Sequence, residues 1–222
     1  MDNVHATGGR VIRPENLDDE TGPDKQASLR DLLKYGRYCG GDRVLRGLVR
    51  RLVAAGEPHS WLDVGAASGN AGQVIRGVRP MATVTSLDYR QEHLAEAPSP
   101  RVVGDAFGPP FRGGSFDFVF CSLFLHHFED AAVVELLRMF GAIARRAVVV
   151  VDLERGPGAY YFTPLTVWLF RWNRITLHDA PASVEAAFKK QELESLARSA
   201  GFRQIHVRRH RPWARLSLVA QP

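Results

Sequence analysis

The sequence predicts an α/β fold with a doubly wound, mostly parallel sheet, and three observations support this prediction. Short runs of apolar and β-branched residues have the composition of buried parallel strands. Segments with apolar residues at helical spacing alternate with these runs. A glycine-rich turn, Gly65-Ala66-Ala67-Ser68-Gly69, separates the first strand from the next helix. This is the arrangement that cradles a nucleotide in α/β proteins.

The expected elements follow in a regular order along the chain. Two N-terminal helices are expected between 25 and 55, broken at Gly40-Gly41. The strands are expected at 61–65, 83–87, 101–104, 115–122, 147–153, 204–211 and 213–219, and the helices between them at 71–79, 131–144 and 188–199. The last two strands alternate apolar and polar residues around Pro212, which is typical of an antiparallel pair at the end of a sheet.

Length and composition indicate one domain. A chain of 222 residues with 45% hydrophobic content can bury a single sizeable core. Residues 1–23 are polar and lack apolar periodicity, so we expect a flexible tail there and a folded domain over 24–222. Within that domain, the aromatic stretch at about 154–187 exceeds the strand and helix pattern and is expected to be a helical insertion before the sixth strand.

Charge and cysteine content narrow the class of protein. The net charge of +5 and the isoelectric point near 9.5 permit a nucleic-acid partner, but the basic residues are scattered and form no aromatic-interleaved block. Cys39 and Cys121 have no metal-ligand spacing, so neither a disulfide framework nor a metal site is expected. There is no secretory signal pattern, and the apolar stretch 159–170 is too short to span a bilayer. We therefore expect a cytoplasmic protein with no transmembrane segment.

Asp63, two residues before the first glycine of the turn, indicates which nucleotide fits there. A pyrophosphate on this turn would face a carboxylate, whereas a cofactor that is cationic and carries no phosphate would be stabilised. Asp63, Gly65, Ala67 and Gly69 resemble the first motif of class I S-adenosylmethionine-dependent methyltransferases, D-x-G-x-G-x-G, with Ala67 in a glycine position. The resemblance covers about 30–219 and implies a Rossmann-like seven-stranded sheet with an antiparallel last strand.

The second strand supports the same cofactor. Asp88 lies 23 residues after Gly65, close to the position at which an acidic residue binds the ribose hydroxyls in this kind of fold. The alternative is an acid on a surface turn. The resemblance implies that Asp105 and the backbone of Ala106 contact adenine, that Tyr89 lies against it, and that S-adenosylmethionine is the cofactor. The full set of expected cofactor contacts is Asp63, Gly65, Ala66, Ala67, Gly69, Asp88, Tyr89, Asp105, Ala106 and Cys121.

His126 and His127 are the candidate catalytic residues. They follow the fourth strand in a pattern that resembles small-molecule methyltransferases acting on quinone and polyketide precursors. A neutral histidine there can take the proton of a phenolic acceptor. A helical step of about 100° per residue would point the two rings in different directions, so one base is expected, with His127 favoured. The alternative is that one ring packs under the insertion and the other caps a helix.

The expected substrate contacts come from the N-terminal helices and the insertion: Tyr38, Tyr160, Trp168, Trp172 and His178. The alternative for the insertion is an extra core helix without substrate contact. These observations together predict methyl transfer to oxygen or carbon of an apolar, aromatic or polyketide-like small molecule by a monomer or homodimer. An RNA methyltransferase is disfavoured because the Asn/Asp-Pro-Pro-aromatic pattern is missing, and a non-catalytic cofactor-binding partner protein is the third possibility.

Overall fold

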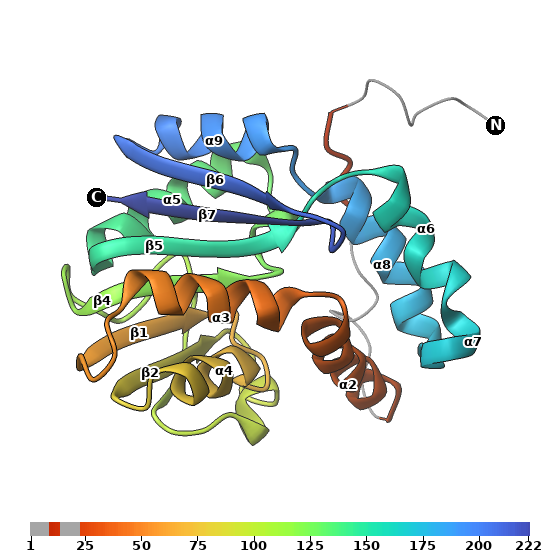
Figure 1. Ribbon diagram of the computed structural model, residues 1–222, viewed down its shortest axis with the longest axis horizontal. Coiled ribbons are helices and arrows are strands. Elements are labelled where there is room, and N and C mark those ends of the chain that lie inside the picture. The colour runs from red at the N-terminus through yellow and green to blue at the C-terminus, as the bar shows by residue number, and fades with distance from the viewer. Residues whose placement is uncertain (1–8, 14–22) are drawn as a thin grey trace.

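The computed structural model describes residues 9–13 and 23–222, and it confirms the predicted α/β class (Figure 1). One seven-stranded sheet has the order β3-β2-β1-β4-β5-β7-β6. Its strands are β1 (His59–Val64), β2 (Ala82–Asp88), β3 (Arg101–Val103), β4 (Phe116–Ser122), β5 (Ala144–Leu153), β6 (Gln204–His210) and β7 (Arg215–Gln221). The pairs among β1 to β5 are parallel, and β7 runs antiparallel to both β5 and β6. The expected antiparallel last strand is therefore confirmed.

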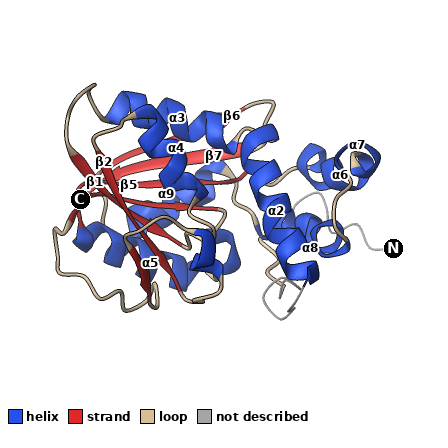
Figure 2. Ribbon diagram, turned by 90° about the horizontal axis from the view of Figure 1, so that it is seen from below, coloured by secondary structure: helices blue, strands red, loops and turns tan. Residues whose placement is uncertain are grey.

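Helices cover both faces of this sheet (Figure 2). α3 (Gly41–Leu52) and α4 (Asn70–Val78) pack on one face, and α5 (Asp130–Ile143) and α9 (Lys190–Ser199) pack on the other. In β5, Val148 and Val150 belong to the α5–α9 core, whereas Val149 and Val151 belong to the α3–α4 core. A strand that is buried on both faces needs apolar residues at successive positions, which explains the continuous apolar run in β5.

Four helices form a helical cap beyond the carboxyl ends of the parallel strands (Figure 1). They are α2 (Pro23–Tyr38), α6 (Pro157–Leu165), α7 (Val167–Phe170) and α8 (Arg174–Ala186). Buried Asp31 connects α2 to the start of α8. Its Oδ2 accepts hydrogen bonds from the backbone N–H of Asn173 (2.7 Å) and from the hydroxyl of Thr176 (2.9 Å). The insertion expected at about 154–187 thus supplies three of the four cap helices.

Several boundaries differ from the sequence prediction: β1 begins at His59 rather than 61, β5 at Ala144 rather than 147, and β7 at Arg215 rather than 213. α9 begins at Lys190 rather than Phe188, because Phe188 forms an isolated parallel bridge with Glu154 and the Glu192 side chain accepts a hydrogen bond from the backbone N–H of Lys189 at the helix start (2.7 Å). The segment after β4 is a short 3₁₀-helix, η2 (Leu125–His127), and a second one, η1 (His93–Glu96), follows β2.

Part of the expected flexible tail is bound to the folded domain. Residues 1–8 and 14–22 lie outside the described residues, but residues 9–13 contact the body of the protein. The backbone N–H of Val11 donates to the carbonyl of Glu185 (3.2 Å), and the Arg10 side chain is 5% exposed. Within the described residues, no helix is long and apolar enough to cross a membrane.

Candidate active site

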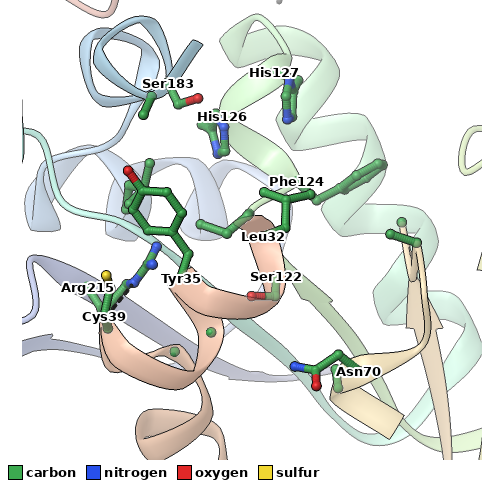
Figure 3. A pocket seen from close by; sticks show the side chains of 18 of the residues that line it. Leu32, Tyr35, Cys39, Asn70, Ser122, Phe124, His126, His127, Ser183 and Arg215 are labelled. Carbon is green, nitrogen blue, oxygen red and sulfur yellow. Dashed lines mark hydrogen bonds between the residues drawn. The ribbon is translucent and has the colours of Figure 1, made fainter. Parts of the chain in front are cut away.

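A cavity of about 1260 Å³ lies between the carboxyl edge of the sheet and the helical cap (Figure 3). Ligand pockets usually measure about 300–1,000 Å³, so this cavity has room for two ligands. The loops after β1, β2 and β3 line one end, which we call the cofactor end. Helices α2, α6 and α8 and the hairpin between β6 and β7 line the other end, which we call the acceptor end.

The glycine-rich turn forms the floor of the cofactor end. Gly65 has a φ of 67°, and a Cβ there would lie 2.5 Å from the Phe124 ring, so no larger side chain fits without movement. Ala67 adopts a φ of 46° although it is not glycine, and its N–H donates to Asp88 Oδ2 (3.0 Å). Gly65, Ala66 and Ala67 all line the cavity.

Asp63 presents an unsatisfied carboxyl to this end of the cavity. It is 2% exposed, and its Oδ2 has no hydrogen-bond partner among the described residues. Burial, followed by the nearby charge of Asp88, raises the pKa of Asp63 to about 7. A ligand that brings a cationic ammonium group would both satisfy the oxygen and favour its ionised form.

Asp88 ends β2 and faces the same space. Although burial alone would raise its pKa, hydrogen bonds from His93, the Arg90 N–H and the Ala67 N–H lower the pKa below its ordinary value. Asp88 therefore carries a negative charge and fixes the turn. A carboxylate has about four acceptor positions, so three protein hydrogen bonds leave limited capacity for a ribose hydroxyl.

The other expected cofactor contacts divide between the cavity wall and the layer behind it. Tyr89, Asp105 and Ala106 line the cavity, with Tyr89 75% exposed at its edge. Gly69 and Cys121 do not line it. Gly69 packs closely on Ala97 and Pro98 before α4, while Cys121 is fully buried within β4. Strand β4 faces α5 at Cys121, so this side chain belongs to the core instead of the cavity.

This end of the cavity fits the cofactor that the resemblance implies. The orphan oxygen of Asp63 suits a positive charge, and Gly65, Ala66 and Ala67 of the glycine-rich turn line the same cavity. The acids Asp63, Asp88 and Asp105 would repel a pyrophosphate. S-adenosylmethionine is cationic and carries no phosphate, so the residues present fit it.

His126 and Asp152 form a buried pair at the boundary of the two ends. His126 is 2% exposed, and its Nδ1 lies 2.7 Å from Asp152 Oδ1 at the end of β5. Burial alone would raise the pKa of Asp152, but the charge of His126 and the hydrogen bond from it lower the pKa below its ordinary value. Both His126 and His127 line the cavity, and Figure 3 shows their rings above Leu32 and Phe124.

The prediction that the rings of His126 and His127 point in different directions is wrong. Their centroids are 4.3 Å apart with an interplanar angle of 29°, so the rings stack. The reason is that η2 is a short 3₁₀-helix and not the start of α5, so the α-helical step does not apply. The hydrogen bond to Asp152 distinguishes the two, because it fixes the ring orientation of His126.

The expected substrate contacts are only partly brought together. Tyr38 lines the cavity, whereas Tyr160, Trp168, Trp172 and His178 do not. Trp168 is 78% exposed on α7, and the His178 side chain is 63% exposed on α8. Half-buried Tyr160 contacts the edge of Tyr161, and buried Trp172 stacks between Tyr35 and Phe170.

The structure brings residues to the site that the sequence interpretation did not single out, and Asp152 is one of them although it does not itself line the cavity. Asp152 ends an apolar β-branched run at the carboxyl edge of the sheet, as Asp63 and Asp88 do, and this position was a usable signal. Arg215 opens β7 and is buried in the acceptor end, and the basic cluster at 203–215 does not show by itself which of its members is buried there. The insertion contributes Phe162 instead of its more conspicuous tryptophans.

Comparisons with known proteins agree with this geometry. Residues 62–144 match the family described as "Methyltransferase domain". The demethylmenaquinone methyltransferase of Thermotoga maritima is 25% identical over 156 residues, which cover 66% of this chain and 68% of the relative.

Two solved structures share the fold. A SAM-dependent methyltransferase from Aquifex aeolicus has a TM-score of 0.63 at 15% identity, over 90% of this chain and 98% of the other. Human N-acetylserotonin methyltransferase, solved in complex with SAM, has a TM-score of 0.55 at 18% identity and matches 84% of this chain. This chain spans 57% of the length of the human protein, less than two thirds. The family match over 62–144, the Thermotoga relative and the cofactor end of the cavity all support the same class, the class I S-adenosylmethionine-dependent methyltransferases.

Proposed function

We propose that the protein methylates an oxygen or carbon atom of an apolar small molecule with an aromatic or polyketide-like ring system. The acceptor end is lined largely by apolar side chains from three cap helices: Leu32, Leu33, Phe162, Ala180 and Val184. Such a wall would cover a flat, greasy ring and keep water away from it. The relative named demethylmenaquinone methyltransferase supports a quinone-like acceptor, because its own name specifies a quinone.

The observation that carries the proposal is the His126–Asp152 pair. S-adenosylmethionine, when bound, supplies an electrophilic methyl group. Asp152 accepts a hydrogen bond from the Nδ1–H of His126, so the imidazole is held in the tautomer whose Nε2 can accept a proton. A phenolic hydroxyl has a pKa of about 10 and histidine of about 6.5. His126 therefore acts as the general base in this proposal, and Asp152 stabilises the imidazolium that results.

In this proposal, the helical cap positions the acceptor and covers the cavity. Positioning a reactant beside the methyl group contributes much of the rate when two ligands share one site. Tyr35 of α2 and Thr163 of α6 share a hydrogen bond across the acceptor end, which ties two cap helices over the cavity. The arrangement excludes water from the reacting atoms.

The test is methyl transfer from labelled S-adenosylmethionine to a panel of catechol, 1,4-naphthoquinol, hydroxybenzoates and unmodified tRNA. The wild-type protein should label a phenol or quinol. His126→Asn should then lower kcat by roughly 10²- to 10⁴-fold and remove the acidic limb of the pH profile. Asp152→Asn should lower kcat in the same direction, because the tautomer is no longer held.

His127→Asn is the matched control, since the 2.7 Å hydrogen bond to Asp152 Oδ1 comes from His126 Nδ1. It should change kcat far less than His126→Asn, and both variants should bind adenosylhomocysteine as the wild type does. Labelling of tRNA without labelling of any phenol or quinol would favour the RNA alternative. A kcat that depends on His127 and not on His126 would transfer the base role.

A further inference from the structure

Arg215 is a buried cation in the wall of the acceptor end. It opens β7, lines the cavity and is 2% exposed. Its Nε donates to the carbonyl of Cys39 (3.3 Å), and its buried Nη1 has no hydrogen-bond partner among the described residues. Figure 3 shows the guanidinium extending from the sheet toward Tyr35. The five N–H donors of an arginine are thus largely unused in the protein alone.

The neighbours of Arg215 do not neutralise its charge. Burial raises the pKa of Tyr35 to about 12 and the pKa of Cys39 to about 11, so both side chains are uncharged at neutral pH. Asp152 is the carboxylate that acts on Arg215 over a distance, but it is hydrogen-bonded to His126 and to the Leu153 N–H. Within the described part of the chain, Arg215 forms no ion pair.

Two other arginines that line this end are already paired, and Lys189 and Arg211, which also line the cavity, are exposed. Arg209 lies 2.5 Å from Glu154, and Arg155 lies 2.6 Å from Glu192. An uncompensated buried charge is costly to a fold, so its retention is best explained by a ligand that supplies the opposite charge. Arg215 is therefore the buried cation of the acceptor end that is available to an anionic ligand.

The sheet order places this cation away from the cofactor. Strands β4 and β5 separate β7 from β1. Three strand spacings amount to about 14 Å, and the cofactor-end acids lie at the carboxyl ends of β1 and β2 and after β3. An anion bound to Arg215 would therefore belong to the acceptor.

We propose that the acceptor carries a carboxylate, which Arg215 binds at the acceptor end of the cavity. The proposal rests on the proposed function and specifies the chemical class of its substrate as an aromatic acid. The planar guanidinium matches the two oxygens of a carboxylate, and one buried positive charge balances one carboxylate charge. The apolar wall then holds the ring, and the carboxylate fixes which ring atom reaches His126.

The experiment compares acids with their methyl esters. Calorimetry on protein saturated with adenosylhomocysteine measures binding of 3,4-dihydroxybenzoate and 6-hydroxy-2-naphthoate, each beside its methyl ester. We expect at least one acid to bind the wild type about ten- to a hundredfold more tightly than its ester. Arg215→Met should abolish this preference and leave adenosylhomocysteine affinity unchanged.

The matched control is Arg79→Met, which removes an arginine that bonds to the carbonyl of Val53 remote from the cavity. It should keep the preference for the acid. If Arg215→Met does not fold, Arg215→Gln takes its place with the same expected loss. Without ligand, Arg215→Met should melt at or above the wild-type temperature, because an uncompensated buried charge has been removed.

Three outcomes would overturn the inference: equal binding of acid and ester in both pairs, an acid preference that survives both substitutions, or a loss of adenosylhomocysteine affinity in Arg215→Met. The last would assign Arg215 to the carboxylate of the cofactor. Methyl transfer measured on the same compounds separates the two proposals. Transfer to acid and ester alike would retain the proposed function without the carboxylate site, and Arg215-dependent binding without any transfer would retain the site without the function.

Discussion

The buried carboxyl of Asp63 gives the protein a distinctive dependence on pH. Burial and Asp88 raise the pKa of Asp63 to about 7, whereas an exposed aspartate in the unfolded chain has a pKa of about 4. Between these values the folded protein binds more protons than the unfolded chain does. The free energy of unfolding that Asp63 contributes therefore falls as the pH rises from about 4 through 7.

Asp63→Asn should remove this loss of stability at higher pH. Without cofactor, we expect the variant to melt roughly 5–10 °C above the wild type at pH 8, and the difference to vanish near pH 4. Calorimetric melting at both pH values measures it. The same substitution should weaken adenosylhomocysteine binding, because a neutral amide no longer balances the ammonium group.

Asp117→Asn is the opposite control. Burial alone would raise the pKa of Asp117, but hydrogen bonds from Ser60 and Arg145 lower the pKa below its ordinary value. Its stabilisation is therefore present at neutral pH and lost as the pH falls, so this variant should melt below the wild type at pH 8. An Asp63→Asn protein that also melts below the wild type at pH 8 would show that the buried carboxyl stabilises the free protein.

The sequence predicts the acids of the cofactor end better than the residues of the acceptor end. Asp63 and Asp88 are recognisable because each ends an apolar strand at a fixed distance from the glycine-rich turn. Asp152 ends a strand in the same way, but its pairing with His126 also requires β4 and β5 to be neighbours. The role of Arg215 depends on which helices cover β7, and no nearby residue encodes that packing.

At the scale of elements, the insertion shows what composition can and cannot predict. Its aromatic density predicted that the segment covers other residues, and α6 and α8 do cover the cavity. Composition does not determine which face of each helix turns inward. That depends on where the helices end: α7 has four residues and stops at Arg171, whose φ of 51° redirects the chain before Trp172. Trp168 therefore lies outside and Trp172 inside.

Substitution of these two tryptophans should give contrasting results. Trp168→Ala should leave the acceptor KM within about twofold and the melting temperature nearly unchanged, because a 78% exposed side chain is lost. Trp172→Ala should cost about 3–5 kcal/mol, because the stack with Tyr35 and Phe170 and the hydrogen bond to Thr166 are removed. Thermal melting and acceptor titrations on both variants measure the contrast. A several-fold rise of KM in Trp168→Ala at unchanged stability would restore the substrate contact that the sequence predicted.

At the scale of the whole molecule, Arg10 connects the N-terminal segment to three distant elements. Its guanidinium donates to the carbonyls of Phe128 (2.8 Å) and Ala186 (2.7 Å), pairs with Asp130 (2.5 Å) and lies 4.1 Å from the centre of the Phe188 ring. A further hydrogen bond reaches the carbonyl of His126 (3.1 Å). Arg10 thus holds η2, which contains the proposed base His126, against the end of α8.

Arg10→Ala should accordingly affect both stability and catalysis. Three carbonyls lose a charged donor, so we expect a loss of about 3 kcal/mol and a melting temperature lower by roughly 6–12 °C. Because His126 loses a contact that holds its backbone, kcat should fall at temperatures well below melting while adenosylhomocysteine affinity stays unchanged. Arg13→Ala is the matched control, since it removes an arginine of the same segment whose side chain is 60% exposed and pairs with Glu185 at 3.2 Å. If Arg10→Ala and Arg13→Ala have the same melting temperature and keep the wild-type kcat, the N-terminal segment does not support η2.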